Sequence, residues 1–282
     1  MVDKKIIVVF CHSRAELLSA CLSSLKNASG IESWNVVIVQ QRGNPEVDKV
    51  IDEFEFLIGT TIIVKPNFEL PLCNINFNRI LGTRYAFETL HADYVLGIEE
   101  DTMVSGDALN FIDYAYNCYK RKKAFRGVNL GSMEYGENIA TNGYSLLRYG
   151  LHGQAGVMTK NSWSYIRRNG LFEFEFSNSK IAWDAEIEFY LKSGFMITPN
   201  VSKSLDLGYG GTFSPKNKYD RYFVEMKKSW DNNNIATDIG YQKIQMRHKW
   251  RSDAIPYRKN ETIIYFLRRN NFLNNLVSAL GV

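Results

Sequence analysis

Short apolar runs alternate with amphipathic segments through most of the chain. Residues 6–10 and 36–39 are continuous runs, mainly of Val and Ile, which are typical of strands buried on both faces of a parallel sheet. Between them, residues 17–25 place apolar side chains three and four positions apart, which predicts an amphipathic helix that stops at Gly30. This order predicts a βαβ unit at the start of the chain.

The same alternation continues to about residue 198. Further helices are predicted at residues 47–56, 77–90, 108–119, 160–168 and 183–192, and further strands at residues 61–64, 93–98, 124–129, 155–158 and 195–198. Residues 131–153, rich in Gly, Asn and Tyr, are expected to form a long loop. The pattern therefore predicts an α/β fold with a mostly parallel sheet and helices on both faces. We expect one domain over residues 1–213 and an extension over residues 214–282, where the rhythm is lost.

Composition and charge narrow the function classes. The chain has 282 residues, 45% of them hydrophobic, and a formal net charge of +4, which is too mildly basic to indicate a nucleic-acid partner. Its four cysteines show no CxxC pair, so we expect reduced thiols and neither a disulfide framework nor structural zinc. The first apolar run is too short for a signal peptide or an anchor, so a cytoplasmic protein is expected.

Three acids follow directly on a predicted buried strand. Glu99, Glu100 and Asp101 come after residues 94–98, and in open α/β sheets ligands bind at the carboxyl ends of strands. Packed carboxylates repel one another unless a cation joins them, and a divalent ion with oxygen ligands would suit a diphosphate substrate. An acidic turn that solvates the strand end is the simpler alternative.

A second acidic pair lies at the start of the helix predicted for residues 183–192. Asp184 and Glu186 follow Trp183 and are two positions apart, so their side chains diverge on a helix. We therefore expect different roles for the two acids if both are functional. Compensation of the helix dipole is the alternative for Asp184.

Taken in order, these stretches resemble a glycosyltransferase of the GT-A fold, and most closely the N-acetylglucosaminyltransferase I family. The resemblance rests on residues 8–14, 39–43, 92–101 and 153–204. The chain departs from the family pattern at three places: it has Gln41 in place of an acid, Glu100 in place of the middle Asp, and Ala185 after Asp184.

The resemblance implies a role for each candidate residue. Asp101 would bind a divalent cation, Mn²⁺ or Mg²⁺, and Asp184 would act as the catalytic base, with Glu186 as the alternative base. The nucleotide-sugar donor would contact the following residues: Cys11, His12, Arg14, Gln41, Asn78, Glu99 and Glu100. Residues 206–213 contain the glycines of a loop that could close over the donor.

The implied activity is metal-dependent, inverting transfer of a sugar, N-acetylglucosamine as the best match, from a UDP-sugar to a glycan hydroxyl. A catalytically silent carbohydrate- or nucleotide-sugar-binding protein on the same fold is one alternative. A nucleotidylyltransferase is another, because Gly82, Thr83 and Arg84 resemble a loop of that class, although here they fall within a helical stripe.

The end of the chain predicts a basic amphipathic helix. Residues 262–282 contain an apolar band interleaved with Arg268 and Arg269. Such a helix can lie on an anionic membrane, which would suit a glycan acceptor carried on a lipid and a peripheral place on the inner membrane face. Docking onto the protein's own core or onto a dimer partner is the alternative.

Overall fold

The computed structural model describes residues 2–41, 43–66, 71–132, 143–147, 155–168, 194–208 and 242–245, together with residues 224, 227, 228 and 230. By its contacts the chain divides into residues 1–246 and 247–282, and every described residue belongs to the first unit. Residues 242–245, which lie beyond the boundary expected at residue 213, join the sheet of this unit.

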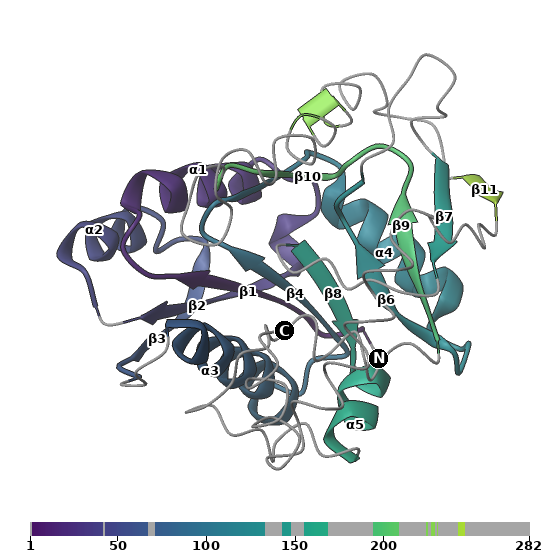
Figure 1. The fold of residues 1–282 in the computed structure, drawn as a ribbon, viewed down its shortest axis with the longest axis horizontal. Helices are drawn as coiled ribbons and strands as arrows, with labels where there is room; N and C mark the ends of the chain where they lie inside the picture. Colours follow the sequence, from purple (N-terminus) through teal and green to yellow (C-terminus); the bar gives the residue numbers. More distant parts are fainter. Residues whose placement is uncertain are drawn as a thin grey trace, which may run out of the picture. The chain divides into compact units, whose positions relative to one another are not determined.

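The described part of the chain contains a nine-stranded sheet with the order β11-β7-β9-β6-β8-β4-β1-β2-β3 (Figure 1). Five of its eight neighbouring strand pairs are parallel, which confirms the predicted mostly parallel α/β sheet. The strands are β1 (Lys5–Cys11), β2 (Asn35–Gln41), β3 (Ile58–Val64), β4 (Tyr94–Glu99), β6 (Phe125–Asn129), β7 (Gly143–Leu147), β8 (Ala155–Thr159), β9 (Phe195–Pro199) and β11 (Gln242–Gln245).

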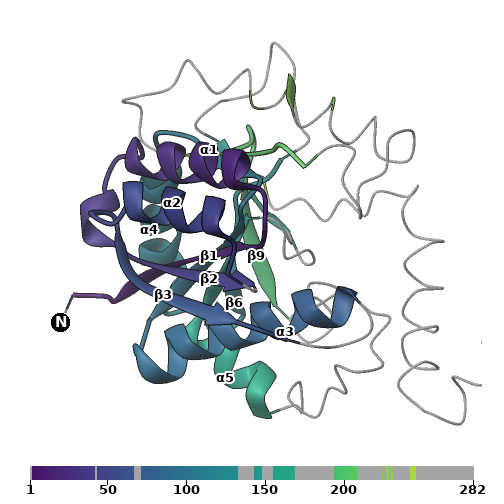
Figure 2. The same ribbon diagram turned by 90° about the vertical axis from the view of Figure 1, so that its left-hand side faces the viewer.

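Helices cover both faces of this sheet (Figure 2). The first face carries α1 (Ala15–Lys26), α2 (Pro45–Glu53) and α4 (Ala108–Tyr119), and the second carries α3 (Pro71–Arg84), a π-helical turn (Tyr85–Thr89) and α5 (Lys160–Arg168). Alternate residues of β1 serve the two layers: Ile7 and Val9 pack with α1 and α4, whereas Ile6 and Val8 pack on the α3 side. Burial on both faces explains why β1 is apolar at every position from Ile6 to Cys11.

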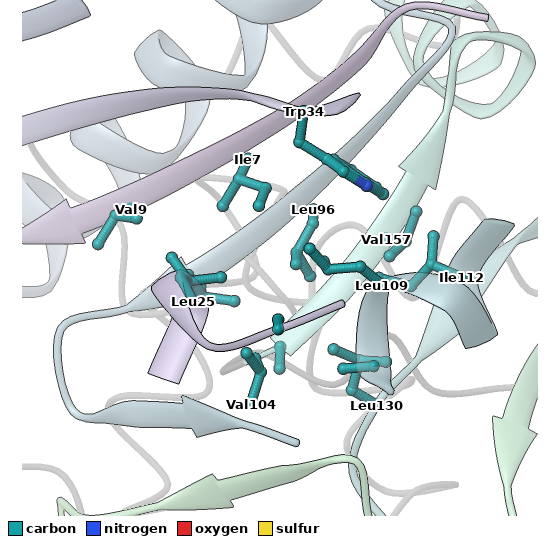
Figure 3. Close-up of a cluster of buried hydrophobic side chains, with 14 of the residues drawn as sticks. Ile7, Val9, Leu25, Trp34, Leu96, Val104, Leu109, Ile112, Leu130 and Val157 are labelled. Carbon is teal, nitrogen blue, oxygen red and sulfur yellow. The ribbon is translucent and has the colours of Figure 1, made fainter. Parts of the chain in front are cut away.

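The larger hydrophobic cluster fills the layer between the sheet and α1 and α4 (Figure 3). Leu25 of α1, Leu109 of α4 and Leu96 of β4 are each fully buried in it. Burial of such side chains contributes about 1.5–3 kcal/mol each, so this layer holds the ends of β1 and β4 in a fixed relation.

Several short elements differ from the sequence-based expectations. β7 lies within residues 131–153, where a loop was expected, and pairs with β9 and β11. A separate two-stranded antiparallel sheet joins β5 (Thr102–Val104) to β10 (Ser204–Asp206). β5, β7 and β10 are short and contain Ser or Thr, so their sequences lack the apolar periodicity that marks a strand. Pairing with distant residues stabilises them.

The glycine of the motif that resembles a nucleotidylyltransferase loop, Gly82, has a packing role. It lies in α3, not in the loop after β1, and a Cβ at this position would lie 2.8 Å from the Phe10 ring and from a Val39 methyl group. The glycine is therefore needed for the close approach of α3 to the sheet. This placement removes the support that the motif offered for the nucleotidylyltransferase alternative.

Candidate active site

The acidic segment lies where the strand order reverses. The chain passes from β1 to β2 and β3 on one side, while β4 pairs with β1 on the other side, and all four strands are parallel. Phe10 is paired with Glu99, and the backbone N–H of Glu100 donates to the carbonyl of Phe10 at 3.0 Å. The loop after β1 therefore meets the loop after β4, at the kind of switch point where open α/β sheets bind ligands.

Glu100 is buried and anchors the loop after β1. Its side chain is 3% exposed, its Oε2 accepts from the backbone N–H of His12 at 2.8 Å, and its Oε1 accepts from Nε of Arg14 at 2.6 Å. Hydrogen bonds to ionised groups are the stronger kind in proteins. Glu100 thus holds His12 and Arg14 in place, although it lies 86 positions after Arg14 in the chain.

Asp101 is also buried, but only one of its oxygens is engaged by the described residues. Its Oδ2 lies 2.8 Å from Nη1 of Arg14, whereas its Oδ1 is buried with no hydrogen-bond partner in the described part of the chain. Burial and the neighbouring Glu99 raise the pKa of Asp101, although Arg14 acts in the opposite direction. A buried carboxylate oxygen of this kind is a natural place for a further cation.

Glu99 points to the other face of the sheet and pairs with Arg79 of α3. The Arg79 side chain is 2% exposed, and its guanidinium lies 4.3 Å from the centroid of the Phe10 ring. Sequence reasoning missed Arg79, and α3 offers no clear signal for it, because the buried residues of this helix also include Asn74 and Asn76. Charge repulsion among the three acids is therefore relieved by Arg14 and Arg79 within the protein.

Asp206 is a second carboxylate beside Asp101, and sequence reasoning assigned it only to a glycine-rich loop. β10 pairs with β5 so that Asp206 faces Thr102, and the backbone N–H of Leu207 donates to the carbonyl of Asp101 at 2.7 Å. A Cβ at Gly208 would lie 2.3 Å from Oδ2 of Asp101 and 3.0 Å from Oδ1 of Asp206. Both carboxylates therefore border one point, which only a glycine leaves open.

This arrangement suits a divalent cation whose coordination shell is completed by the substrate. Among the described residues no three His, Cys, Asp or Glu side chains gather closely enough to form a metal site alone. Mg²⁺ is commonly held by one or two carboxylates together with substrate phosphates and water. Asp101, with its buried Oδ1, and the neighbouring Asp206 fit that kind of site.

The other predicted donor-site residues lie at the same sheet edge. Nδ2 of Asn78, on α3, donates to Oε1 of Gln41 at 2.7 Å, and Oδ1 of Asn78 is buried with no hydrogen-bond partner in the described segments. His12 is exposed beside Glu100. Cys11 differs from the expectation, because its side chain belongs to the core below the site and burial raises the pKa of its thiol.

Asp184, Glu186 and the loop beyond Gly208 lie outside the described residues, as does the helix predicted for residues 262–282. All four cysteines are free thiols in the structure, and Cys118 is the exposed one. None of the helices in the described segments is both long and apolar enough to cross a lipid bilayer.

The nine-stranded sheet and its two helical layers form a mixed α/β fold that solved structures share. A crystal structure of S. aureus TarS matches 78% of this chain and 39% of its own, with a TM-score of 0.50 and 13% sequence identity. TarS 1–349 matches 83% of this chain and 66% of its own, with a TM-score of 0.51 and 11% identity. The matched region thus spans less than two thirds of either TarS chain.

Neither a comparison with protein-family models nor one with curated proteins finds a match for this sequence. The similarity to TarS therefore establishes the fold. The narrower resemblance to the N-acetylglucosaminyltransferase I family stays a prediction.

Proposed function

We propose that this chain is a metal-dependent, inverting glycosyltransferase that uses a UDP-sugar donor. The observation that carries the proposal is the buried Asp101, with an unpartnered carboxylate oxygen at the β1–β4 switch point of a GT-A-like sheet. TarS 1–349 has itself been solved in complex with UDP-GlcNAc and with UDP. We therefore take a UDP-sugar as the donor class, with N-acetylglucosamine as the first sugar to test.

The donor side of the reaction is assigned to residues that meet at the sheet edge. Gln41 and Asn78 present amide groups that suit a nucleobase, because Oδ1 of Asn78 is an acceptor without a partner among the described residues. Arg14 is 43% exposed and offers a guanidinium to a diphosphate. Glu99 is held by Arg79 and is exposed enough to reach a sugar or ribose hydroxyl.

The leaving diphosphate needs its charge neutralised as the bond to the sugar breaks. Asp101, and Asp206 beside it, would hold a Mn²⁺ or Mg²⁺ ion, which as a Lewis acid would stabilise that charge. Glu100 acts indirectly, since both of its oxygens already hold the loop that carries Arg14.

The acceptor hydroxyl needs a base. We propose Asp184 for this role and keep Glu186 as the alternative, because both acids follow Trp183 in the pattern that the family resemblance supplies. A positioned carboxylate base contributes about a hundred- to ten-thousand-fold to the rate. We propose a glycan, free or carried on a lipid, as the acceptor.

The test is release of UDP from a panel of UDP-sugars, measured with Mn²⁺, with Mg²⁺ and with excess chelator. We expect UDP-GlcNAc to be turned over only with metal, and Asp101→Asn to lose turnover while it keeps the fold. Asp52→Asn is the matched control, because Asp52 is an exposed acid on α2, away from the site. Full turnover by Asp101→Asn, or in chelator, would contradict the metal requirement.

Two further variants separate the acids proposed for the base. Asp184→Asn keeps the side-chain shape and should lower turnover by at least about a hundredfold with donor affinity nearly unchanged. If Glu186→Gln is the inactive variant, Glu186 is the base. Binding of UDP-GlcNAc without turnover under any condition would favour a silent binding protein on this fold.

A further inference from the structure

Arg14 covers the two buried acids at the switch point. Its Nε lies 2.6 Å from Oε1 of Glu100, and its Nη1 lies 2.8 Å from Oδ2 of Asp101. The Arg14 side chain is 43% exposed, whereas those of Glu100 and Asp101 are 3% and 8% exposed. The Arg14 side chain therefore borders solvent, whereas both carboxylates lie inside the protein.

The two carboxylates that contact Arg14 differ in how many other contacts they make. Glu100 also accepts from the backbone N–H of His12, so its carboxylate is fixed from two sides. Asp101 has one oxygen on Arg14 and a second, buried oxygen without a partner among the described residues. Loss of Arg14 would thus leave Asp101 as a buried carboxylate in need of another cation, because an uncompensated buried charge is costly.

We infer that Arg14 takes the place of the divalent cation at Asp101 in the donor-free protein and yields Asp101 when a diphosphate binds. The inference rests on the proposed function, since it assumes that Asp101 is the metal ligand. It adds that metal and donor bind as a coupled pair, with Arg14 as the residue that couples them.

The chemistry of the guanidinium favours this exchange. Its planar set of donors matches a carboxylate and a phosphate equally well, so a bound diphosphate competes directly with Asp101 for Arg14. Once Arg14 turns to the diphosphate, both oxygens of Asp101 become available to a metal. Such coupling is reciprocal, so metal must raise the affinity for the diphosphate by the factor by which the diphosphate raises the affinity for metal.

The experiment titrates the full-length protein with Mn²⁺, without nucleotide and then with UDP, and follows free Mn²⁺ by electron paramagnetic resonance. Without nucleotide, Arg14→Ala should bind Mn²⁺ about 5- to 150-fold more tightly than the unmodified protein, the usual range of coupling between two sites. Added UDP should tighten Mn²⁺ binding strongly in the unmodified protein and less in Arg14→Ala.

Three further variants locate the effect. Arg84→Ala is the matched control, because Arg84 forms a 3.1 Å ion pair with Glu88 on α3 and the following turn, and it should bind Mn²⁺ as the unmodified protein does. Asp101→Asn added to Arg14→Ala should abolish the tighter binding. Arg14→Lys keeps the positive charge but cannot contact both carboxylates with one planar group. Its Mn²⁺ affinity should therefore lie between those of the unmodified protein and Arg14→Ala.

Unchanged donor-free Mn²⁺ affinity in Arg14→Ala would overturn the inference. If Arg14→Ala does not fold, judged by its thermal unfolding, Arg14→Gln provides the same comparison with a neutral side chain of similar reach. Failure of the proposed function has a different signature: Arg14→Ala would bind Mn²⁺ more tightly as expected, but no UDP-sugar would be turned over.

Discussion

Gly208 provides a sharp test of the site geometry. A Cβ at this position would lie 2.3 Å from Oδ2 of Asp101, well inside the 3.0 Å below which real Cβ atoms are essentially never found. Gly208→Ala therefore forces either the loop or the Asp101 carboxylate to move. Asp101 is held by Arg14 at 2.8 Å, and Asp206 accepts from the backbone N–H of Gly208 at 2.7 Å, so neither acid moves without loss of a contact.

The cost follows from overpacking of a buried site. Insertion of one extra methyl group into such a site typically costs about 1–3 kcal/mol. For a domain of this size, each kcal/mol lowers the melting temperature by about 2–4 °C. If Asp101 rotates away to make room, the loss of stability falls at the low end of this range, and Mn²⁺ binding in the presence of UDP weakens by at least about tenfold, which is 1.4 kcal/mol.

Gly106→Ala is the matched control for this change. Gly106 lies in the turn between β5 and α4, and a Cβ there would meet nothing within 4 Å. This variant should keep or slightly raise the melting temperature, because alanine reduces the entropy of the unfolded chain. Differential scanning calorimetry and Mn²⁺ titration of both variants complete the test. Gly208→Ala with the melting temperature and Mn²⁺ affinity of Gly106→Ala would refute the close approach of Gly208 to Asp101.

Other predictions follow from the ion pairs, the buried acids, the thiols and the tail. Asp107→Ala should lower the free energy of unfolding, measured in urea, by about 3 kcal/mol, because Lys203 is 1% exposed and loses a carboxylate at 2.6 Å; a loss under 1 kcal/mol would contradict this. Burial raises the pKa of Asp101, so the native state holds its proton more tightly than the unfolded state, and stability should fall as pH rises from about 4 through the raised pKa. With a chelator present, Asp101→Asn should remove this dependence of the unfolding free energy on pH. An unchanged pH dependence would show that other groups cause it. A thiol reagent should label Cys118 rapidly in the native protein and the three buried cysteines only after unfolding; fast labelling of more than one thiol would contradict their burial. If residues 262–282 form a membrane-surface helix, the full chain should bind anionic vesicles in a salt-sensitive way, and truncation before residue 262 should abolish binding but spare UDP release. Insoluble truncated protein, with no vesicle binding by the intact chain, would place that helix in the core or in a dimer interface.

The sheet was predictable because its central strands are buried on both faces. Such strands carry continuous runs of apolar residues, and the central residues of β1, β2 and β4 stand out in the sequence for that reason. The helices between them show their buried face as spacings of three and four residues. The acids after β4 were predictable too, since a parallel strand that ends in three carboxylates places them at the ligand-binding edge.

The arrangement within the site depended on contacts between residues far apart in the chain. Arg14 and Glu100 are 86 positions apart, and the pairing of β10 with β5 places Asp206 beside Asp101. No local pattern encodes such contacts, because strand pairing and the burial of charges are decided by the whole packed fold. Local periodicity therefore marks the strands and helices along the chain, whereas only the assembled sheet shows that Arg14 and Asp206 share one site with Asp101.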